Sequence, residues 1–98
     1  MPYAISWMDE PGTAELRRDL RDAHLDYMRK NVGNVLASGG LLDDSGETGI
    51  GGLIILDTDS REVAENFVKA DPFYTGGLYK NPTVVRWRKA FYDGKAYI

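Results

Sequence analysis

The chain contains no cysteine and only one histidine among its 98 residues. Disulfides, thiolate nucleophiles and cysteine metal sites are therefore excluded. Zinc or iron would have to rely on His24 and on scattered carboxylates, none of which shows a familiar ligand spacing. The glycines of residues 46–52 precede a predicted strand, whereas a phosphate or dinucleotide loop should open a helix. We therefore expect neither a metal nor a cofactor.

Excess basic charge and long apolar runs are also missing. Twelve basic and fifteen acidic side chains give a formal net charge of −3, which disfavours nucleic-acid binding because that usually needs a clustered basic face. No apolar run reaches membrane-spanning length, and the first residues lack the basic and apolar regions of a secretory signal. We expect a soluble, cytoplasmic protein that binds neither nucleic acid nor membrane.

The composition that remains is typical of a folded domain. Hydrophobic residues make up 43% and charged residues 28% of the chain, and residues 1–98 are expected to form a single domain. A domain of this size buries only part of its apolar surface, so association with a second copy is expected.

The hydrophobic periodicity alternates between strand and helix patterns. It predicts strand, helix, strand, strand, helix, strand, in the segments 3–9, 13–30, 35–43, 51–57, 61–70 and 83–91. This order is the split βαβ arrangement of α+β, ferredoxin-like folds, in which both helices pack on one face of a four-stranded antiparallel sheet. In the last strand, Val85, Trp87 and Phe91 should share one side.

The segment 51–57 is a short apolar run without alternation, which suits a strand buried on both faces. The predicted helices cover one face of the sheet only. The opposite face should therefore meet a partner sheet, and a homodimer is the economical answer.

His24 lies four residues after Leu20 and four before Met28, so it shares the apolar stripe of the first helix and points inward. The simpler interpretation is a buried histidine satisfied by a backbone carbonyl or a carboxylate. The functional interpretation needs a partner. Asp71 is a candidate, although Asp followed by Pro72 is also a common way to start a short helix.

The two interpretations of Asp71 are compatible, because one carboxylate can cap a turn and also accept a hydrogen bond from an imidazole. If the second helix packs beside the first, its C-terminal connection brings Asp71 near His24. The carboxylate would then fix the imidazole tautomer and stabilise its protonated form. The other ring nitrogen would be left to move protons on a substrate, which is general acid-base chemistry.

Other side chains could complete a pocket around this pair. Arg17 and Arg21 border the face of His24 and could attract an anionic substrate, although such arginines are more often solvated. Ser38 lies beside two glycines, but no nucleophile motif surrounds it. The aromatic residues expected at the pocket wall are Tyr27, Phe73 and Tyr74, for which core packing is the simpler account.

Three segments together resemble the YCII-related domain proteins: "RDAHLDYM", "GGLLDDSGETGIGGLIIL" and "AENFVKADPFYTGGLYKNPTVVRW". The resemblance covers nearly the whole chain. It implies a ferredoxin-like, dimeric α+β barrel in which a His and an Asp in a cleft form the proposed catalytic pair, here His24 and Asp71. Related proteins include enzymes acting on hydroxylated or chlorinated products of aromatic-ring breakdown, and the fold also serves non-enzymatic roles.

Three functional hypotheses follow. The first is a cofactor-independent lyase or isomerase in which His24 is the acid-base and Asp71 orients it, acting on a small, enolic or aromatic-derived carboxylated compound. Arg21 and Ser38 would contact the substrate. The second is a dimeric ligand-binding or regulatory module in which the pair only organises a pocket, and the third is a purely structural subunit.

Overall fold

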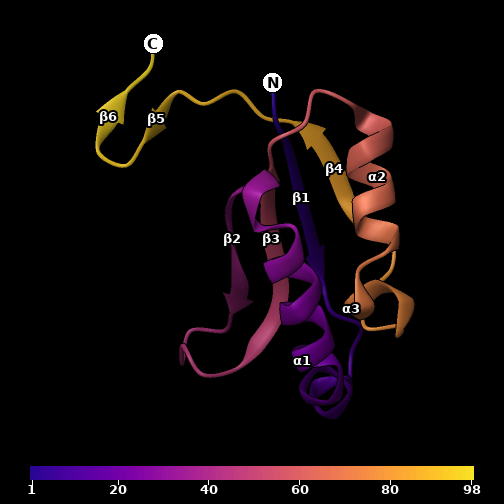
Figure 1. Ribbon diagram of the computed structural model, residues 1–98. Helices are drawn as coiled ribbons and strands as arrows, with labels where there is room; N and C mark the ends of the chain where they lie inside the picture. Colours follow the sequence, from indigo (N-terminus) through magenta and orange to yellow (C-terminus); the bar gives the residue numbers. More distant parts are fainter.

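The computed structural model describes all 98 residues (Figure 1). It contains the predicted strand and helix order, with short additional elements. In chain order these are β1 (Tyr3–Met8), α1 (Ala14–Lys30), a 3-10 turn (Val32–Asn34), β2 (Val35–Leu42), β3 (Gly49–Leu56), α2 (Arg61–Lys69), α3 (Pro72–Thr75), β4 (Thr83–Arg86), β5 (Phe91–Tyr92) and β6 (Lys95–Ala96). The α+β, ferredoxin-like prediction is confirmed.

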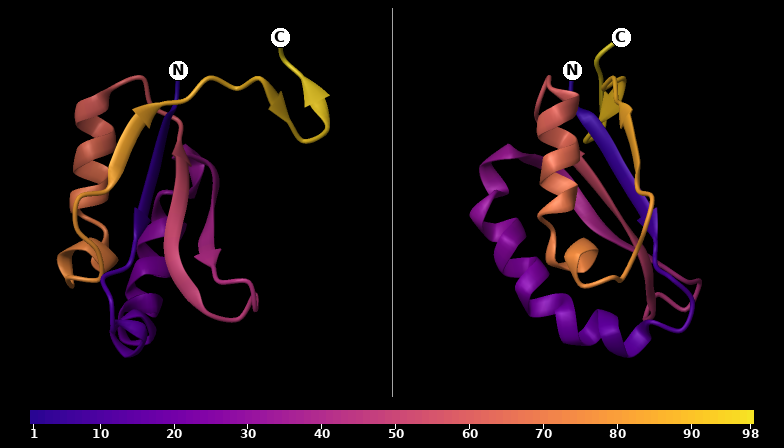
Figure 2. Two further views of the ribbon diagram at one scale, coloured as in Figure 1. Left: turned by 180° about the vertical axis from the view of Figure 1, so that it is seen from behind. Right: turned by 90° about the vertical axis from the view of Figure 1, so that its right-hand side faces the viewer.

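The main sheet has the strand order β2-β3-β1-β4, and every neighbouring pair is antiparallel. The right-hand view of Figure 2 shows both long helices on the same side of this sheet. Alternate residues of β1, namely Tyr3, Ile5 and Trp7, are buried on the helix side. They pack in one core with the apolar stripe of α2, which includes Phe67 and Val68. The buried face of the strand, with its period of 2, thus contacts the buried face of the helix, with its period of 3.6.

The other face of the sheet, which we call the open face, has no helix over it. Met8 is 57% exposed, Leu53 40% and Val85 48%. These three side chains lie on alternate positions from the core residues of their strands. The expectation that the segment 51–57 is buried on both faces is therefore not met for Leu53 within one chain, although Ile55, on the same face, is only 8% exposed.

The last predicted strand is shorter than expected. Strand β4 ends at Arg86, which pairs with Tyr3, and the final bond to the body runs from the Trp87 amide to the Pro2 carbonyl at 2.9 Å. Strand β1 begins at Tyr3, the partner of Arg86, so the ladder stops there. Phe91 consequently does not share a strand with Val85, and it begins the separate two-stranded sheet of β5 and β6.

None of the helices combines the length and the apolar character needed to cross a membrane.

Candidate functional site

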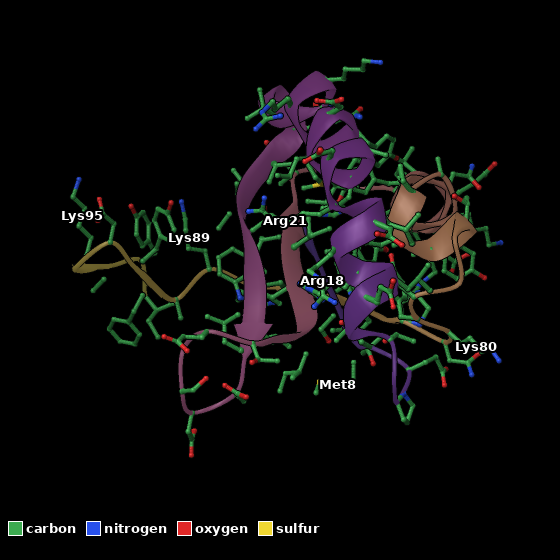
Figure 3. All side chains as sticks on the ribbon, turned by 90° about the horizontal axis from the view of Figure 1, so that it is seen from below. Met8, Arg18, Arg21, Lys80, Lys89 and Lys95 are labelled. Atoms are coloured by element: carbon green, nitrogen blue, oxygen red, sulfur yellow. The ribbon has the colours of Figure 1, made fainter.

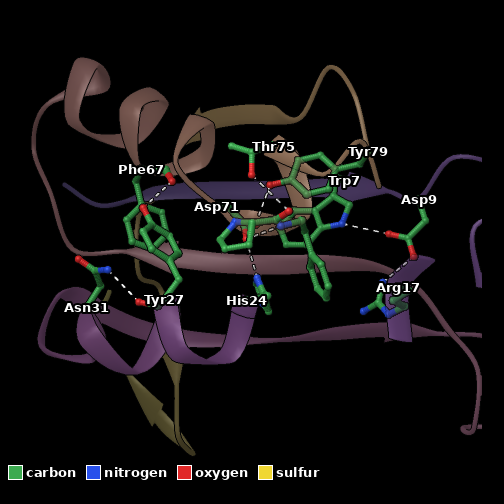
Figure 4. A network of polar contacts seen from close by, with 12 residues as sticks. Trp7, Asp9, Arg17, His24, Tyr27, Asn31, Phe67, Asp71, Thr75 and Tyr79 are labelled. Carbon is green, nitrogen blue, oxygen red and sulfur yellow. Dashed lines mark hydrogen bonds and ion pairs between the residues drawn. The ribbon is translucent and has the colours of Figure 1, made fainter. Parts of the chain in front are cut away.

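His24 and Asp71 meet although they are 47 residues apart in sequence (Figure 4). His24 projects from α1, and Asp71 is the N-cap residue of α3, two positions after the end of α2. Their Nδ1 and Oδ1 atoms are 2.7 Å apart. Helices α1 and α3 pack against each other, which brings the turn after α2 to the middle of α1.

Asp71 is almost completely buried, with 1% of its surface exposed, and both of its carboxylate oxygens have partners. Oδ1 accepts from His24 and also from the Phe73 amide at 3.0 Å, which is the N-cap bond. Oδ2 accepts from the Tyr79 hydroxyl at 2.9 Å. Asp71 is therefore at once a helix cap and a partner of the histidine, and its orientation is held from three directions.

The environment of Asp71 also affects the tyrosines nearby. Burial and then the negative charge of Asp71 raise the pKa of the Tyr79 hydroxyl above its usual range. The same two causes, in the same order, raise the pKa of Tyr27. Both tyrosines are thus kept neutral, and the Tyr79 hydroxyl can only serve as a donor to the carboxylate.

The imidazole of His24 is clamped between aromatic side chains. It stacks on Phe73 with the ring centres 4.0 Å apart and the planes 9° from parallel, and it meets Trp7 edge-on at 6.4 Å. The side chain is 13% exposed. Its Nε2 has no partner within the chain and is not sealed from solvent. The ring therefore offers one nitrogen to the protein and the other to whatever enters the site.

A second set of contacts fixes the wall beside this pair. Trp7 stacks on Tyr79 at 4.3 Å, and its Nε1 donates to Asp9 at 3.2 Å. Asp9 also accepts from Arg17 at 2.6 Å, and the other end of that guanidinium donates to the Gly51 carbonyl at 3.1 Å. Arg17 is thus a neutralised, anchored part of the wall and has little freedom to pair with a ligand.

A cavity of about 530 Å³ opens between α1 and the strands β2 and β3. Its ionisable lining consists of the His24 imidazole, three arginines (Arg17, Arg18 and Arg21) and a single acidic residue, Glu47. Figure 3 shows Arg18 and Arg21 between α1 and these strands. Both are exposed, and neither makes an ion pair in the structure. The cavity therefore presents two free cations near the histidine, which favours an anionic ligand.

The structure brings most, though not all, of the predicted site residues together. His24, Arg21, Ser38 and Phe73 line the cavity, and Asp71 lies buried behind His24.

Tyr27 and Tyr74 do not line the cavity. The Tyr27 hydroxyl instead donates to the Phe67 carbonyl at 2.7 Å, because one turn beyond His24 the helix already faces α2. Tyr74 points from α3 toward a separate surface depression beside α2, which Arg61 also lines.

Three residues that contribute to the site were not identified from the sequence, namely Arg18, Trp7 and Tyr79. Arg18 was detectable, because it lies one turn before Arg21 on the same helix face. Trp7 and Tyr79 were not, because their positions depend on strand pairing and on the turn that Gly77 makes at φ +86°. No group of three or more His, Asp or Glu side chains is arranged to hold a metal ion.

Comparison with known proteins identifies the family. Residues 1–88 match the YCII-related domain. The chain belongs to this family. Protein YciI from Escherichia coli O6:H1 and Protein YciI from Shigella flexneri are each 30% identical to this chain in a 98-position alignment that covers 93% of this chain and all of the relative.

One solved structure that is similar to this chain is that of an enzyme. It is 5-chloro-2-hydroxyhydroquinone dehydrochlorinase (TftG) from Burkholderia phenoliruptrix AC1100, in complex with 2,5-dihydroxybenzoquinone. The TM-score is 0.82 and the identity 28%, over 90% of this chain and 94% of the other.

Proposed function

We propose that this protein is a cofactor-independent enzyme that moves a proton on a small anionic, enolic or aromatic-derived compound, in a lyase or isomerase reaction. The observation that carries the proposal is the buried Asp71–His24 hydrogen bond at the edge of an arginine-lined cavity. A histidine whose orientation is fixed on one side and open on the other is suited to general acid-base catalysis.

In this mechanism Asp71 acts through His24. The carboxylate accepts from Nδ1, so the neutral imidazole carries its lone pair on Nε2, where it can remove a proton from the substrate. The resulting imidazolium is stabilised by the carboxylate charge, and Nε2 can return the proton to another atom of the substrate or to a leaving group. Stacking on Phe73 keeps the ring from rotating out of line.

The cavity favours a flat, negatively charged substrate. Phe73 and Trp7 supply aromatic walls, and Arg18 and Arg21 can each donate to a carboxylate, phenolate or enolate oxygen. The dehydrochlorinase structure, which holds an oxygenated six-membered ring, supports a substrate of this kind. Ser38 lines the same cavity and could donate to a further substrate oxygen.

A substrate screen with matched variants tests the proposal. Catechol-, hydroquinone- and lactone-type compounds are offered to the protein, to His24→Ala and to Asp71→Asn. We expect turnover to fall about 10²–10⁴-fold when His24 is lost, the usual contribution of a general acid-base. A turnover that neither substitution affects would show that the pair has no part in catalysis.

The charge preference has its own control on the same helix. Arg21→Gln should raise KM for an anionic substrate and leave kcat nearly unchanged, because the arginine holds the substrate without touching the proton that moves. Arg29→Gln removes an equal charge from α1, but Arg29 is ion-paired with Asp26 and lies outside the cavity lining. If both substitutions raise KM equally, only the overall charge of the protein matters.

A non-catalytic, dimeric ligand-binding or regulatory module is the alternative. It is favoured by the structural duties of Asp71, which caps α3 and accepts from Tyr79 whether or not any reaction occurs. Calorimetry that detects stoichiometric binding of a screened compound, with no turnover of it under any condition, would support this alternative.

We also propose that the protein acts as a homodimer in the cytoplasm. The apolar side chains of the open face, Met8, Leu53 and Val85, support a dimer in which two such faces pack together. Light scattering at micromolar concentration tests the association, and a wild-type monomer would contradict it.

A further inference from the structure

The last eleven residues, 88–98, form what we call the C-terminal arm. Figures 1 and 2 show the arm leaving the end of β4, passing the ends of the other strands and lying clear of the body beyond β2. It consists mainly of the small β5–β6 hairpin. The match to the YCII-related domain covers residues 1–88, so all of the arm except its first residue lies beyond that match.

The arm exposes large apolar side chains. Phe91 is 70% exposed, Tyr92 43%, Tyr97 45% and Ile98 81%. A two-stranded hairpin is marginally stable in water by itself and normally needs another surface to cover an apolar face. Such a concentration of exposed aromatic and aliphatic groups is typical of an interaction site.

The body of the same chain does not supply that surface. No hydrogen bond or ion pair joins residues 89–98 to residues 1–87. The arm is held by its own contacts, which include the Tyr97 amide bonded to the Ala90 carbonyl at 2.7 Å and the Lys89 ammonium 4.0 Å from the centre of the Tyr97 ring. All of its hydrogen bonds and cation–π contacts are thus internal, and its apolar side chains are left without cover from the body.

Charge distinguishes the arm from the rest of the chain. The arm carries three basic residues and one acidic residue, whereas residues 1–87 carry nine basic and fourteen acidic ones. The turn between β2 and β3 adds a local acidic cluster, because Asp43, Asp44 and Glu47 are all exposed there. A basic arm on an acidic body is complementary to the body of another copy.

We propose that the arm crosses to a second copy of this chain and packs its apolar side chains against the border of that copy's open face. Each copy gives one arm and receives one, as a two-fold interface requires. The inference rests on the proposed homodimer and adds to it a second contact, because the arm exposes apolar side chains that the body of its own chain does not cover. It does not depend on the reaction at His24.

Variants in the arm test this under conditions that leave the fold intact, because the altered side chains are exposed. The double variant Phe91→Asp/Ile98→Asp should raise the dimer Kd at least about tenfold, the effect of losing one well-buried apolar anchor. Val32→Asp is the matched control, since Val32 is 67% exposed on the 3-10 turn after α1. Sedimentation velocity over a concentration series gives the Kd.

A third variant, Leu53→Asp, separates failure of the arm from failure of the dimer. If Leu53→Asp dissociates the dimer and Phe91→Asp/Ile98→Asp does not, the open faces pair and the arm proposal is wrong. If the wild-type chain is a monomer, both the dimer and the arm exchange are wrong, while the activity assays at His24 still stand by themselves.

Crosslinking tests which surface of the second copy the arm contacts. Because the chain has no native cysteine, only the introduced cysteines can react. Ile98→Cys chains are mixed with Leu53→Cys chains and treated with a short bis-maleimide. Covalent dimers containing one of each are expected, with few or none when Val32→Cys replaces Leu53→Cys. Equal yields in the two mixtures, or none in either, would overturn the proposed docking place.

Discussion

Replacing Tyr79 with phenylalanine gives the sharpest test of the buried network around Asp71. The substitution removes one hydroxyl and keeps the ring that stacks on Trp7. The lost bond is to a buried carboxylate at 2.9 Å, and bonds to charged groups contribute about 1.5–3 kcal/mol. We therefore expect Tyr79→Phe to lower the free energy of unfolding by about 2 kcal/mol near pH 8.

The difference in the free energy of unfolding between the wild type and Tyr79→Phe should vanish at alkaline pH. An unfolded tyrosine loses its proton near pH ~10, whereas burial and the Asp71 charge raise the pKa of Tyr79 in the folded protein. Because the folded pKa is raised, the stabilisation is fully present below pH ~10 and is lost as the pH rises, by about 1.4 kcal/mol per pH unit. At pH ~11.5 the wild-type chain should have lost about 2 kcal/mol from this group, and the variant none.

Urea unfolding followed by circular dichroism, at one protein concentration and at several pH values from 8 to 11.5, measures the gap between the two proteins. Tyr27 titrates in both and cancels. Tyr74→Phe is the control at pH 8, since the Tyr74 hydroxyl makes no hydrogen bond and its loss should change the free energy of unfolding little. A gap that is absent at pH 8, or that stays the same up to pH 11.5, would refute the assignment of Tyr79 as the donor to Asp71.

Three further substitutions test the packing beside the site and the cap of α2. Gly52→Ala should cost about 1–3 kcal/mol, because a Cβ there would overlap the Trp7 indole, whereas Gly39→Ala on the neighbouring strand meets nothing and should stay within about 0.5 kcal/mol. Thermal unfolding compares them, and equal losses would contradict the close contact. Ser60→Ala should cost about 1 kcal/mol, since the Ser60 hydroxyl accepts from the Val63 amide at 3.2 Å and caps α2. Unchanged stability would show that water replaces this cap at no cost.

The elements and the fold class were predictable from the sequence because their signals are local. The alternation in β1 and the apolar stripes of α1 and α2 each lie within one segment, and their order left few topologies to consider. The N-cap role of Asp71 was also predictable locally, because Asp followed by Pro is a common start of a helix. The error in the last strand came from a non-local cause. Whether 87–91 continues a strand depends on the length of β1, which lies at the other end of the chain.

The site divides in the same way. Sequence alone determined that His24 points inward from a helix and that Asp71 starts a turn, because periodicity and capping act over a few residues. Only the tertiary structure decided that the two are bonded, that Tyr79 holds the carboxylate from behind, and that Tyr27 faces α2 instead of the cavity. These facts depend on how α1, α3 and β1 pack, and packing joins residues whose separation in sequence carries no signal of their contact.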